Sequence, residues 1–398
     1  MSCELTRLDM VVNVRFPGTK AHGIQLAAMA EALADTGLNV DVVVPRRFPY
    51  RQIDPWDHYG VRRTFGVSRI ANIDTIDMFP ARGQRVPFLV QSLTFGLRAL
   101  ARAAVERDAG LLVRDHYTTE ILVGGMRKPD RERIAAEIHN LPERSLPRRR
   151  IVQALQELKA IITISDGLRD DLIAEGLDPR SILVARDGVH LDRFRDQPAP
   201  RTARQHLGVP VDMPAIVYAG QLYRWKGVDT LIEAMGQLPD AQLLVVGGDQ
   251  ENLPRIESLV AKHAPGRVRL TGMVPHHAVP FYLSAADVIA LPNSAEQVIS
   301  RRYTSPLKMF EAMAAGRPIV ASDIPSLREV LEADRNALLV KPDDPGALAA
   351  GLRLLLDEPQ LGMQLAENAE EDVKTYDWSE RGRRVAHFLR DRLTVGSH

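Results

Sequence analysis

The sequence alternates between short apolar runs, typical of buried strands, and longer amphipathic stretches, typical of helices. In the first repeat, residues 8–14 form a predicted strand, residues 23–35 an amphipathic helix and residues 39–44 a second strand. Parallel strands need a crossover connection of this kind, and a helix usually supplies it. The alternation therefore predicts an α/β fold in which helices cover parallel sheets.

The alternation restarts in the second half of the chain. At 398 residues, the chain is longer than one hydrophobic core usually organises. A polar, proline-rich stretch between Ile182 and Arg204 interrupts the pattern and indicates a linker. We expect a first domain at 1–197, a second at 198–378 and a terminal helix at 379–398. The apolar runs behind this division are 111–113, 135–138, 161–164, 215–219, 242–246, 268–271 and 287–291.

The stretch from Tyr303 to Ser322, Y-T-S-P-L-K-M-F-E-A-M-A-A-G-R-P-I-V-A-S, joins a polar loop to a helix and then to a strand. Ser305 and Pro306 predict the start of the helix, because serine caps helices and proline is tolerated at the first helical position. Apolar residues at three- and four-residue spacing predict one buried face. Glu311 lies at the edge of that face, where packing explains a carboxylate poorly. An ordinary strand-to-helix unit without a ligand is the alternative interpretation.

This segment resembles the signature of the family 4 glycosyltransferases, in the subgroup that carries S-P-L-K. The resemblance implies a retaining hexosyltransferase of the GT-B superfamily, with two Rossmann-like parallel-sheet domains facing a cleft. The first domain would bind the acceptor and the second the nucleotide sugar. In relatives the second signature glutamate, here Glu311, holds the ribose hydroxyls. Loop amides at the positions of Ser305, Leu307 and Lys308 hold the diphosphate.

The segment departs from the usual family pattern at two positions. Tyr303 stands where relatives have a first glutamate, and Pro306 stands where they have a glycine whose N–H can bind phosphate. We interpret both departures as features of a subgroup of active enzymes.

A second motif, A-G-Q-L-Y-R-W-K-G at residues 219–227, follows the first predicted strand of the second domain. Gly220 lets the backbone approach a ligand, and Lys226 brings a positive charge to the start of a helix, which together suit an anion. Relatives bind the donor diphosphate with this lysine and with an arginine five residues earlier. That earlier position is Gln221, so we expect Arg224 to supply the missing charge. A solvated lysine is the alternative interpretation of Lys226.

Weaker signals complete the expected donor pocket and the first-domain side of the site. Gly248 and Val274 follow strands where relatives hold the base, although plain turns would look the same. Asn293 follows the strand opposite the expected diphosphate loop and is expected to meet sugar hydroxyls. His139 ends a buried strand, where relatives also have a histidine, but a structural histidine is the alternative. Relatives pass a glycine-bearing loop beneath the donor sugar at the positions of Gly18, His22 and Gly23.

The resemblance also implies a mechanism. No carboxylate pair suited to a double displacement falls within these motifs. The family mechanism is a same-face substitution, in which Lys226, Arg224 and helix-start amides stabilise the leaving diphosphate. Lys226, Arg224, His139 and Glu311 are therefore the expected catalytic residues. The sequence has no Asp-x-Asp motif at a strand end, so we expect no cofactor and no metal requirement.

The amino-acid composition narrows the range of binding partners that we expect. With 51 basic and 51 acidic side chains, the chain has no global charge that would favour nucleic acid. Arg144 and the run Arg148–Arg150 are candidates for peripheral contact with an anionic inner membrane face, although a solvated surface is the alternative. A single cysteine, Cys3, indicates a reducing cytoplasm, and no run of about 20 apolar residues is evident by inspection.

The expected function is transfer of a hexose from a UDP- or GDP-linked donor to a hydroxyl of a small-molecule or lipid-linked glycan acceptor. Two alternatives stay open. One is a UDP-sugar epimerase of the same fold. The other is a catalytically silent GT-B subunit that binds a partner, which the departures at Tyr303, Gln221 and Pro306 suggest.

Overall fold

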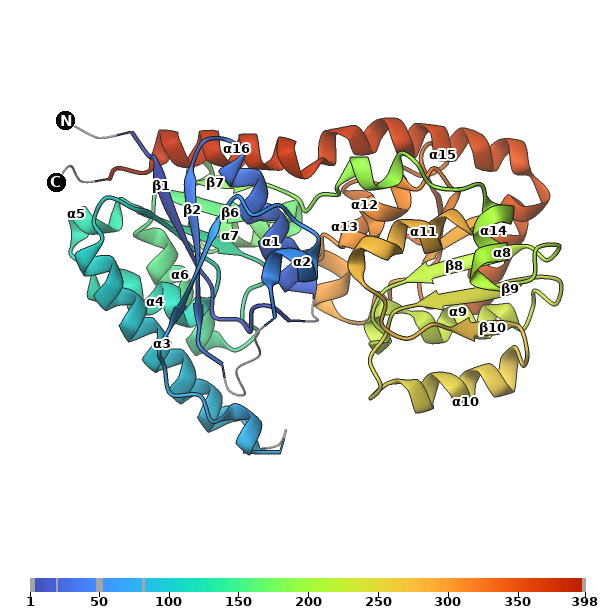
Figure 1. Cartoon of the computed structure of the whole chain (residues 1–398), viewed down its shortest axis with the longest axis horizontal. Coiled ribbons are helices and arrows are strands. Elements are labelled where there is room, and N and C mark those ends of the chain that lie inside the picture. The colour runs from blue at the N-terminus through green and yellow to red at the C-terminus, as the bar shows by residue number, and fades with distance from the viewer. Residues whose placement is uncertain (1–3, 19–20, 48–52, 81–82, 396–398) are drawn as a thin grey trace. The chain divides into compact units, whose positions relative to one another are not determined.

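The computed structural model describes residues 4–18, 21–47, 53–80 and 83–395, and Cys3 lies outside these ranges. The chain divides into two compact units (Figure 1). The first comprises Met1–Arg186 and Trp378–His398, and the second comprises Asp187–Asp377. The sequence analysis placed the boundary at residue 197. The structure places it earlier, because the Val189 N–H donates a 3.0 Å hydrogen bond to the Tyr376 carbonyl oxygen and so joins the second unit.

Within its described residues, the first unit forms a seven-stranded parallel sheet in the order β3-β2-β1-β4-β5-β6-β7. The inner strands are buried on both faces, and parallel strands of this kind are continuous apolar runs in the sequence. The edge strands β3 and β7 were not predicted as strands, because they are short and only partly buried. The strands are β1 (Arg7–Val11), β2 (Asn39–Pro45), β3 (Gly66–Ile70), β4 (Gly110–Val113), β5 (Ile134–Ile138), β6 (Ala160–Thr163) and β7 (Ile182–Val184).

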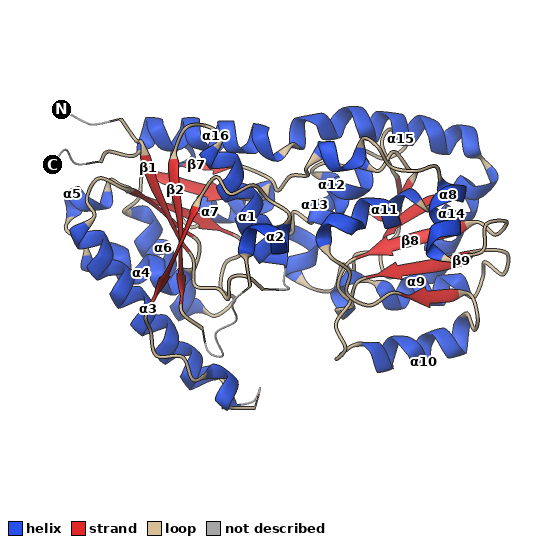
Figure 2. Ribbon diagram, viewed as in Figure 1, coloured by secondary structure: helices blue, strands red, loops and turns tan. Residues whose placement is uncertain are grey.

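Helices cover the two sides of this sheet (Figure 2). Helices α1 and α16 pack together in one layer, and α3, α4 and α6 form a second group of neighbours. The helices of this unit are α1 (Ala21–Ala34), α2 (Pro55–Tyr59), α3 (Arg85–Val105), α4 (His116–Gly125), α5 (Lys128–Arg131), α6 (Ser145–Gln156), α7 (Asp166–Ala174) and α16 (Trp378–Arg392), with short 3₁₀ turns η1 (Ile76–Met78) and η3 (Pro179–Ser181).

The second unit repeats the architecture with a six-stranded parallel sheet in the order β10-β9-β8-β11-β12-β13 among its described residues. Its strands are β8 (Ala215–Ala219), β9 (Gln242–Val246), β10 (Val268–Leu270), β11 (Val288–Leu291), β12 (Ile319–Ser322) and β13 (Leu338–Val340). Its α-helices are α8 (Pro200–Leu207), α9 (Val228–Met235), α10 (Leu253–His263), α11 (Val279–Ser284), α12 (Leu307–Ala314), α13 (Pro325–Arg328), α14 (Pro345–Asp357) and α15 (Pro359–Val373).

The second unit has a hydrophobic cluster on each side of its sheet. Along β8, Val217 belongs to the cluster that includes α12, while Ile216 and Tyr218 belong to the cluster that includes α9 and α14. Successive strand residues point to opposite faces, so β8 is buried on both sides. Both sheets have the strand order of doubly wound folds, in which ligands bind beyond the carboxyl ends of the strands.

One helix in the described part of the chain, α3, is long and apolar enough to cross a membrane by length and composition alone. Its most apolar window has a mean hydropathy of 1.2, and 33% of that window is buried. The expectation from the sequence that no stretch approaches a membrane span is therefore corrected for this helix.

The terminal helix α16 belongs to the first unit through a buried charge network. Arg381 and Glu137 are almost fully buried, and the Arg381 Nη2 atom lies 2.9 Å from Glu137 Oε1. Arg114 lies 3.3 Å from the other carboxylate oxygen, and Gln25 donates a 3.1 Å hydrogen bond to Oε1. Burial raises the pKa of Glu137, but the two arginines outweigh it and hold that pKa well below its ordinary value. The network joins α16 to β4, β5 and α1.

Replacing Arg381 with alanine should destabilise the protein. The change leaves a buried carboxylate with one arginine fewer, and such losses cost about 3 kcal/mol. Urea denaturation of Arg381→Ala measures this cost. Arg383→Ala is the matched control, because Arg383 is on the same helix but exposed and paired with Glu380, and it should change stability by less than about 0.5 kcal/mol. Equal effects of the two variants would contradict the role of the network.

Candidate functional site

The loop after β8 packs against the loop after β11, and a glycine makes this approach feasible. Gly227 has φ 75°, and a Cβ atom there would lie 1.6 Å from the Pro292 carbonyl oxygen. The Ser294 N–H also donates a 3.0 Å hydrogen bond to the Trp225 carbonyl oxygen. Lys226 lies in the 3₁₀ turn η5 (Arg224–Lys226), directly before α9. The two contacts hold this turn against the loop after β11.

The side chains of a half-buried lysine, Lys226, and a buried lysine, Lys308, lie near each other in the second unit. Lys308, in the first turn of α12, is 8% exposed, and its Nζ atom has no hydrogen-bond partner among the described residues. Burial lowers the pKa of Lys308 well below its ordinary value, and the charge of Lys226 lowers it further. Burial also lowers the pKa of Lys226, to about 8. A buried cation without a counter-charge is costly, so this pair is a candidate anion site.

Aromatic rings and Gly220 complete the surroundings of the two lysines. The Lys308 Nζ atom lies 4.7 Å from the centre of the Tyr218 ring, and the Lys226 Nζ atom lies 4.0 Å from the centre of the Trp225 ring. Cation–π contacts of this kind stabilise a charge only partly. A Cβ atom on Gly220 would lie 3.7 Å from Lys308 Cδ, so the glycine borders the lysine side chain.

Asn293 adds a second unsatisfied group to the second unit. Its side chain is fully buried, and both its Nδ2 and Oδ1 atoms lack a partner among the described residues. Buried amides are nearly always hydrogen-bonded in folded proteins. A polar ligand with hydroxyl groups would satisfy both atoms.

The start of α12 differs from the sequence expectation. The helix begins at Leu307, and Pro306 rather than Ser305 occupies the capping position. Ser305 does not cap the helix, because its hydroxyl accepts a 3.0 Å hydrogen bond from the Asp187 N–H. Leu307 and Lys308 are consequently the first two helical residues, whose N–H groups have no intrahelical acceptor.

Glu311 lies one turn further along α12 and is paired with a residue that the sequence analysis missed. The His276 Nε2 atom lies 2.6 Å from Glu311 Oε1, and Glu311 is 8% exposed. His276 follows the loop that contains Val274, which the sequence singled out. The adjacent histidines at 276 and 277 were the signal that could have identified it.

Arg224, expected to supply the second positive charge, has an exposed side chain beside an acidic residue. Its side chain is 76% exposed and its Nη1 atom lies 3.5 Å from Asp229 Oδ2. Arg255 of α10 pairs with the same carboxylate. The buried cation near Lys226 is Lys308, which the sequence had singled out only for its backbone amide.

The glycine turns after β9 and β10 have a structural explanation. Gly248 has φ 97°, and a Cβ atom there would lie 2.4 Å from Leu222 Cδ1. The Gly247 N–H donates a 2.9 Å hydrogen bond to the Gly272 carbonyl oxygen, which joins the two loops. Val274 is half-buried against the core of the second unit. These contacts hold the strand ends in place, whether or not a base binds there.

In the first unit, the structure places His139 beside the buried charge network. Its Nε2 atom lies 3.0 Å from Arg114 Nη2 and 3.1 Å from Glu137 Oε1, and its side chain is 30% exposed. The network therefore holds the ring at the end of β5 while one side of it stays accessible.

Tyr59, also missed by the sequence analysis, organises the glycine-bearing loop of the first unit. The Gly18 N–H donates a 2.7 Å hydrogen bond to the Tyr59 hydroxyl oxygen, and a Cβ atom on Gly23 would lie 2.3 Å from that oxygen. Burial raises the pKa of Tyr59 to about 12. His22 is exposed at the start of α1. The two glycines thus have a packing role against Tyr59.

Across the residues that the structure describes, no three His, Cys, Asp or Glu side chains gather closely enough to hold a metal ion.

Comparisons with known proteins match this description. Residues 201–372 match the family model for glycosyl transferases group 1. A D-inositol 3-phosphate glycosyltransferase of Xylanimonas cellulosilytica is 32% identical over 239 residues, which are 57% of this chain and 56% of that relative. The chain therefore spans little more than half the length of this curated relative.

Solved structures match over nearly the whole chain. Sucrose-phosphate synthase of Thermosynechococcus elongatus gives a TM-score of 0.78 at 22% identity, covering 97% of this chain and 99% of that one. Anabaena HepE in complex with UDP gives a TM-score of 0.75 at 17% identity, covering 97% and 100%. Residues 201–372 of the second unit therefore resemble the glycosyl transferases group 1, and the two units have the predicted GT-B fold.

The lysine pair predicts opposite effects of one substitution on stability and on anion binding. Lys308→Met removes a buried amine without a partner, so it should stabilise the protein by about 1 kcal/mol, measured by urea denaturation. Inorganic pyrophosphate should raise the melting temperature of the wild type and not that of the variant. Lys262→Met on the exposed face of α10 is the control and should behave as the wild type. A pyrophosphate shift that survives in Lys308→Met would contradict the anion site.

Proposed function

We propose that the chain is a retaining glycosyltransferase of the S-P-L-K subgroup that moves a hexose from a nucleoside-diphosphate sugar to a hydroxyl of a small-molecule or lipid-linked glycan acceptor. The observation that carries the proposal is the buried Lys308, whose Nζ atom has no hydrogen-bond partner among the described residues and which lies near Lys226. A nucleotide sugar brings a diphosphate that would neutralise both. The family match of the second unit supports the same class of reaction.

The donor is assigned to the second unit. The ammonium groups of Lys226 and Lys308 bind the diphosphate, and the N–H groups of Leu307 and Lys308 at the start of α12 add to the binding. Glu311 accepts hydrogen bonds from the ribose hydroxyls, since its carboxylate lies one turn from that helix start. Asn293 offers a buried donor and acceptor to the sugar hydroxyls.

We propose a same-face substitution for the transfer. The bond between the anomeric carbon and the diphosphate oxygen breaks, a bond from the acceptor oxygen to that carbon forms on the same face, and the departing diphosphate takes the acceptor proton. Negative charge grows on the diphosphate as the bond breaks, so the two lysines stabilise the transition state more than the ground state. His139 is assigned to a hydrogen bond with a sugar hydroxyl.

The lysine pair also supports transfer without a divalent cation. In many nucleotide-sugar enzymes a metal ion neutralises the diphosphate, and here two ammonium groups are available for that task. We therefore expect transfer to persist in EDTA. UDP is the first nucleotide to test, because HepE, which shares the fold, is described in complex with UDP.

The test is release of the nucleoside diphosphate from UDP- and GDP-linked hexoses, alone and with candidate acceptors, together with calorimetric donor binding. Lys226→Ala and Glu311→Ala should each weaken donor binding at least about 30-fold, because hydrogen bonds to charged groups contribute about 2 kcal/mol. Lys262→Ala and Glu257→Ala, two exposed charges on α10, are matched controls and should bind as the wild type. Wild-type affinity in both site variants would overturn the assignment.

The silent-subunit alternative rests on Tyr303, which is 8% exposed and replaces the first signature glutamate. It predicts UDP binding that depends on Lys226 and Lys308 without turnover of any donor. The same assay therefore separates the two functions. An epimerase would instead convert the donor sugar without an acceptor.

A further inference from the structure

The outward face of α3 in the first unit is apolar along most of its length. Val86, Val90, Leu93 and Leu97 recur at four- and three-residue spacing and so lie along one stripe of the helix, and they are 67%, 38%, 52% and 51% exposed. Leu89 lies beside them and is 38% exposed. We call these five residues the α3 face.

The opposite side of the same helix packs into the first unit. Gln91 and Phe95 are fully buried, and Ala99 and Ala103 are 3% exposed. Helix α3 also packs along α4, with the Phe88 and Tyr117 rings 5.9 Å apart at their centres. The helix is therefore fixed in the unit on one side and presents leucine and valine side chains to the surroundings on the other. Surface helices of soluble proteins normally present polar residues there.

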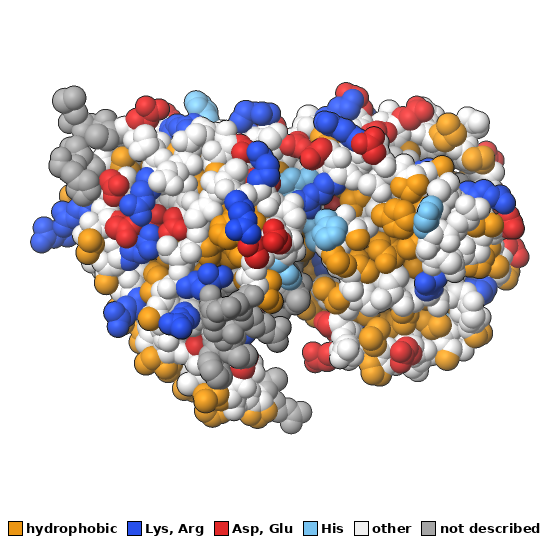
Figure 3. All heavy atoms as spheres, in the orientation of Figure 1, with side chains coloured by type: hydrophobic (Ala, Val, Ile, Leu, Met, Phe, Trp, Pro, Cys, Tyr) orange, Lys and Arg blue, Asp and Glu red, His pale blue; other side chains and the backbone are white. Residues whose placement is uncertain are grey.

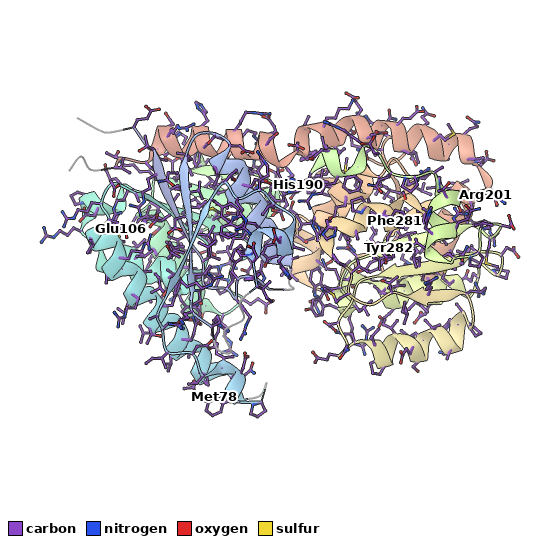
Figure 4. The ribbon with its side chains drawn as sticks, viewed as in Figure 1. Met78, Glu106, His190, Arg201, Phe281 and Tyr282 are labelled. Carbon is purple, nitrogen blue, oxygen red and sulfur yellow. The ribbon has the colours of Figure 1, made fainter. Side chains whose placement is uncertain are left out.

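Figures 3 and 4 show where this surface lies. In Figure 3, hydrophobic side chains follow the lower edge of the first unit, where Figure 1 places α3. Figure 4 labels Met78 near the start of α3 and Glu106 just past its end. Met78 and the adjacent Phe79 are 68% and 47% exposed, so they extend the apolar surface beyond the first turn.

The charges on α3 are all positive. Its sequence contains no Asp or Glu, and Arg85 and Arg98 lie on the two flanks of the α3 face, both exposed. None of the ion pairs found among the described residues involves either arginine. An apolar stripe between basic side chains is the pattern of helices that lie in the interface of an anionic membrane.

We propose that the α3 face docks the first unit on an anionic phospholipid surface, with leucine and valine side chains in the acyl boundary and Arg85 and Arg98 at the headgroups. A second copy of the chain fits less well, because a two-fold contact through this face would bring the flanking arginines of the two copies together. A membrane-spanning role does not fit either, because Phe95 and its neighbours are packed inside the unit. The inference uses no property of the donor site and stands apart from the proposed function.

The test is co-sedimentation with vesicles of phosphatidylglycerol and phosphatidylcholine, compared with vesicles of phosphatidylcholine alone. The wild type should bind the anionic vesicles, and added salt should weaken the binding. Leu93→Glu should lower the partition coefficient at least about tenfold, since it removes a leucine that the acyl boundary would bury and adds a negative charge that anionic lipid repels. Met363→Glu is the matched control, because Met363 is an exposed apolar residue on α15 of the second unit, at 55% exposure, and it should bind as the wild type.

Circular dichroism and pyrophosphate binding check that Leu93→Glu stays folded. Failure of the wild type to bind anionic vesicles, or unchanged binding of Leu93→Glu, would overturn the proposal. Equal binding to neutral vesicles would overturn the assignment to an anionic surface. A wild-type dimer that Leu93→Glu dissociates in the absence of lipid would show that a second copy covers the face instead.

Discussion

The burial of Lys308 beside Lys226 is the constraint on which the proposed donor site depends. Lys226 comes from the loop after β8 and Lys308 from the first turn of α12, and the Lys308 Nζ atom has no hydrogen-bond partner in the described part of the chain. Burial lowers the pKa of each. The fold tolerates this cost because the loop is held on Pro292 and Ser294 and because hydrophobic clusters surround β8 and α12 on both sides. A site that is costly when empty becomes favourable when an anion fills it.

The first unit also buries a charged side chain, but there neighbouring residues neutralise the charge. Glu137 is even more deeply buried than Lys308, but Arg114 and Arg381 neutralise it. Its network therefore stabilises structure, because it recruits the terminal helix and orients His139. The two charge clusters therefore differ in whether the protein itself neutralises the charge. A satisfied network holds elements together, whereas an unsatisfied pair of cations is arranged for something that binds.

The sequence predicted the parts of the fold that depend on local pattern. Strands β8 and β9 lie at the predicted residues, because strands buried on both faces are unbroken apolar runs. Helix α3 and the edge strands β3 and β7 escaped prediction, since an apolar outward face or partial burial erases the expected periodicity. The partnership of Lys226 with Lys308, and of Glu311 with His276, depends on packing between segments far apart in the chain. No local pattern carries that information.

The number of protons taken up when UDP binds tests the central claim most directly. In the free protein burial lowers the pKa of Lys226 to about 8 and lowers that of Lys308 well below its ordinary value, so at about pH 9 the Lys226 amine is largely neutral. A diphosphate beside them raises both pKa values. Calorimetry in buffers of different ionisation enthalpy should show net proton uptake when UDP binds, and less uptake in Lys308→Met. UDP binding without proton uptake, or with the same uptake in that variant, would contradict the account.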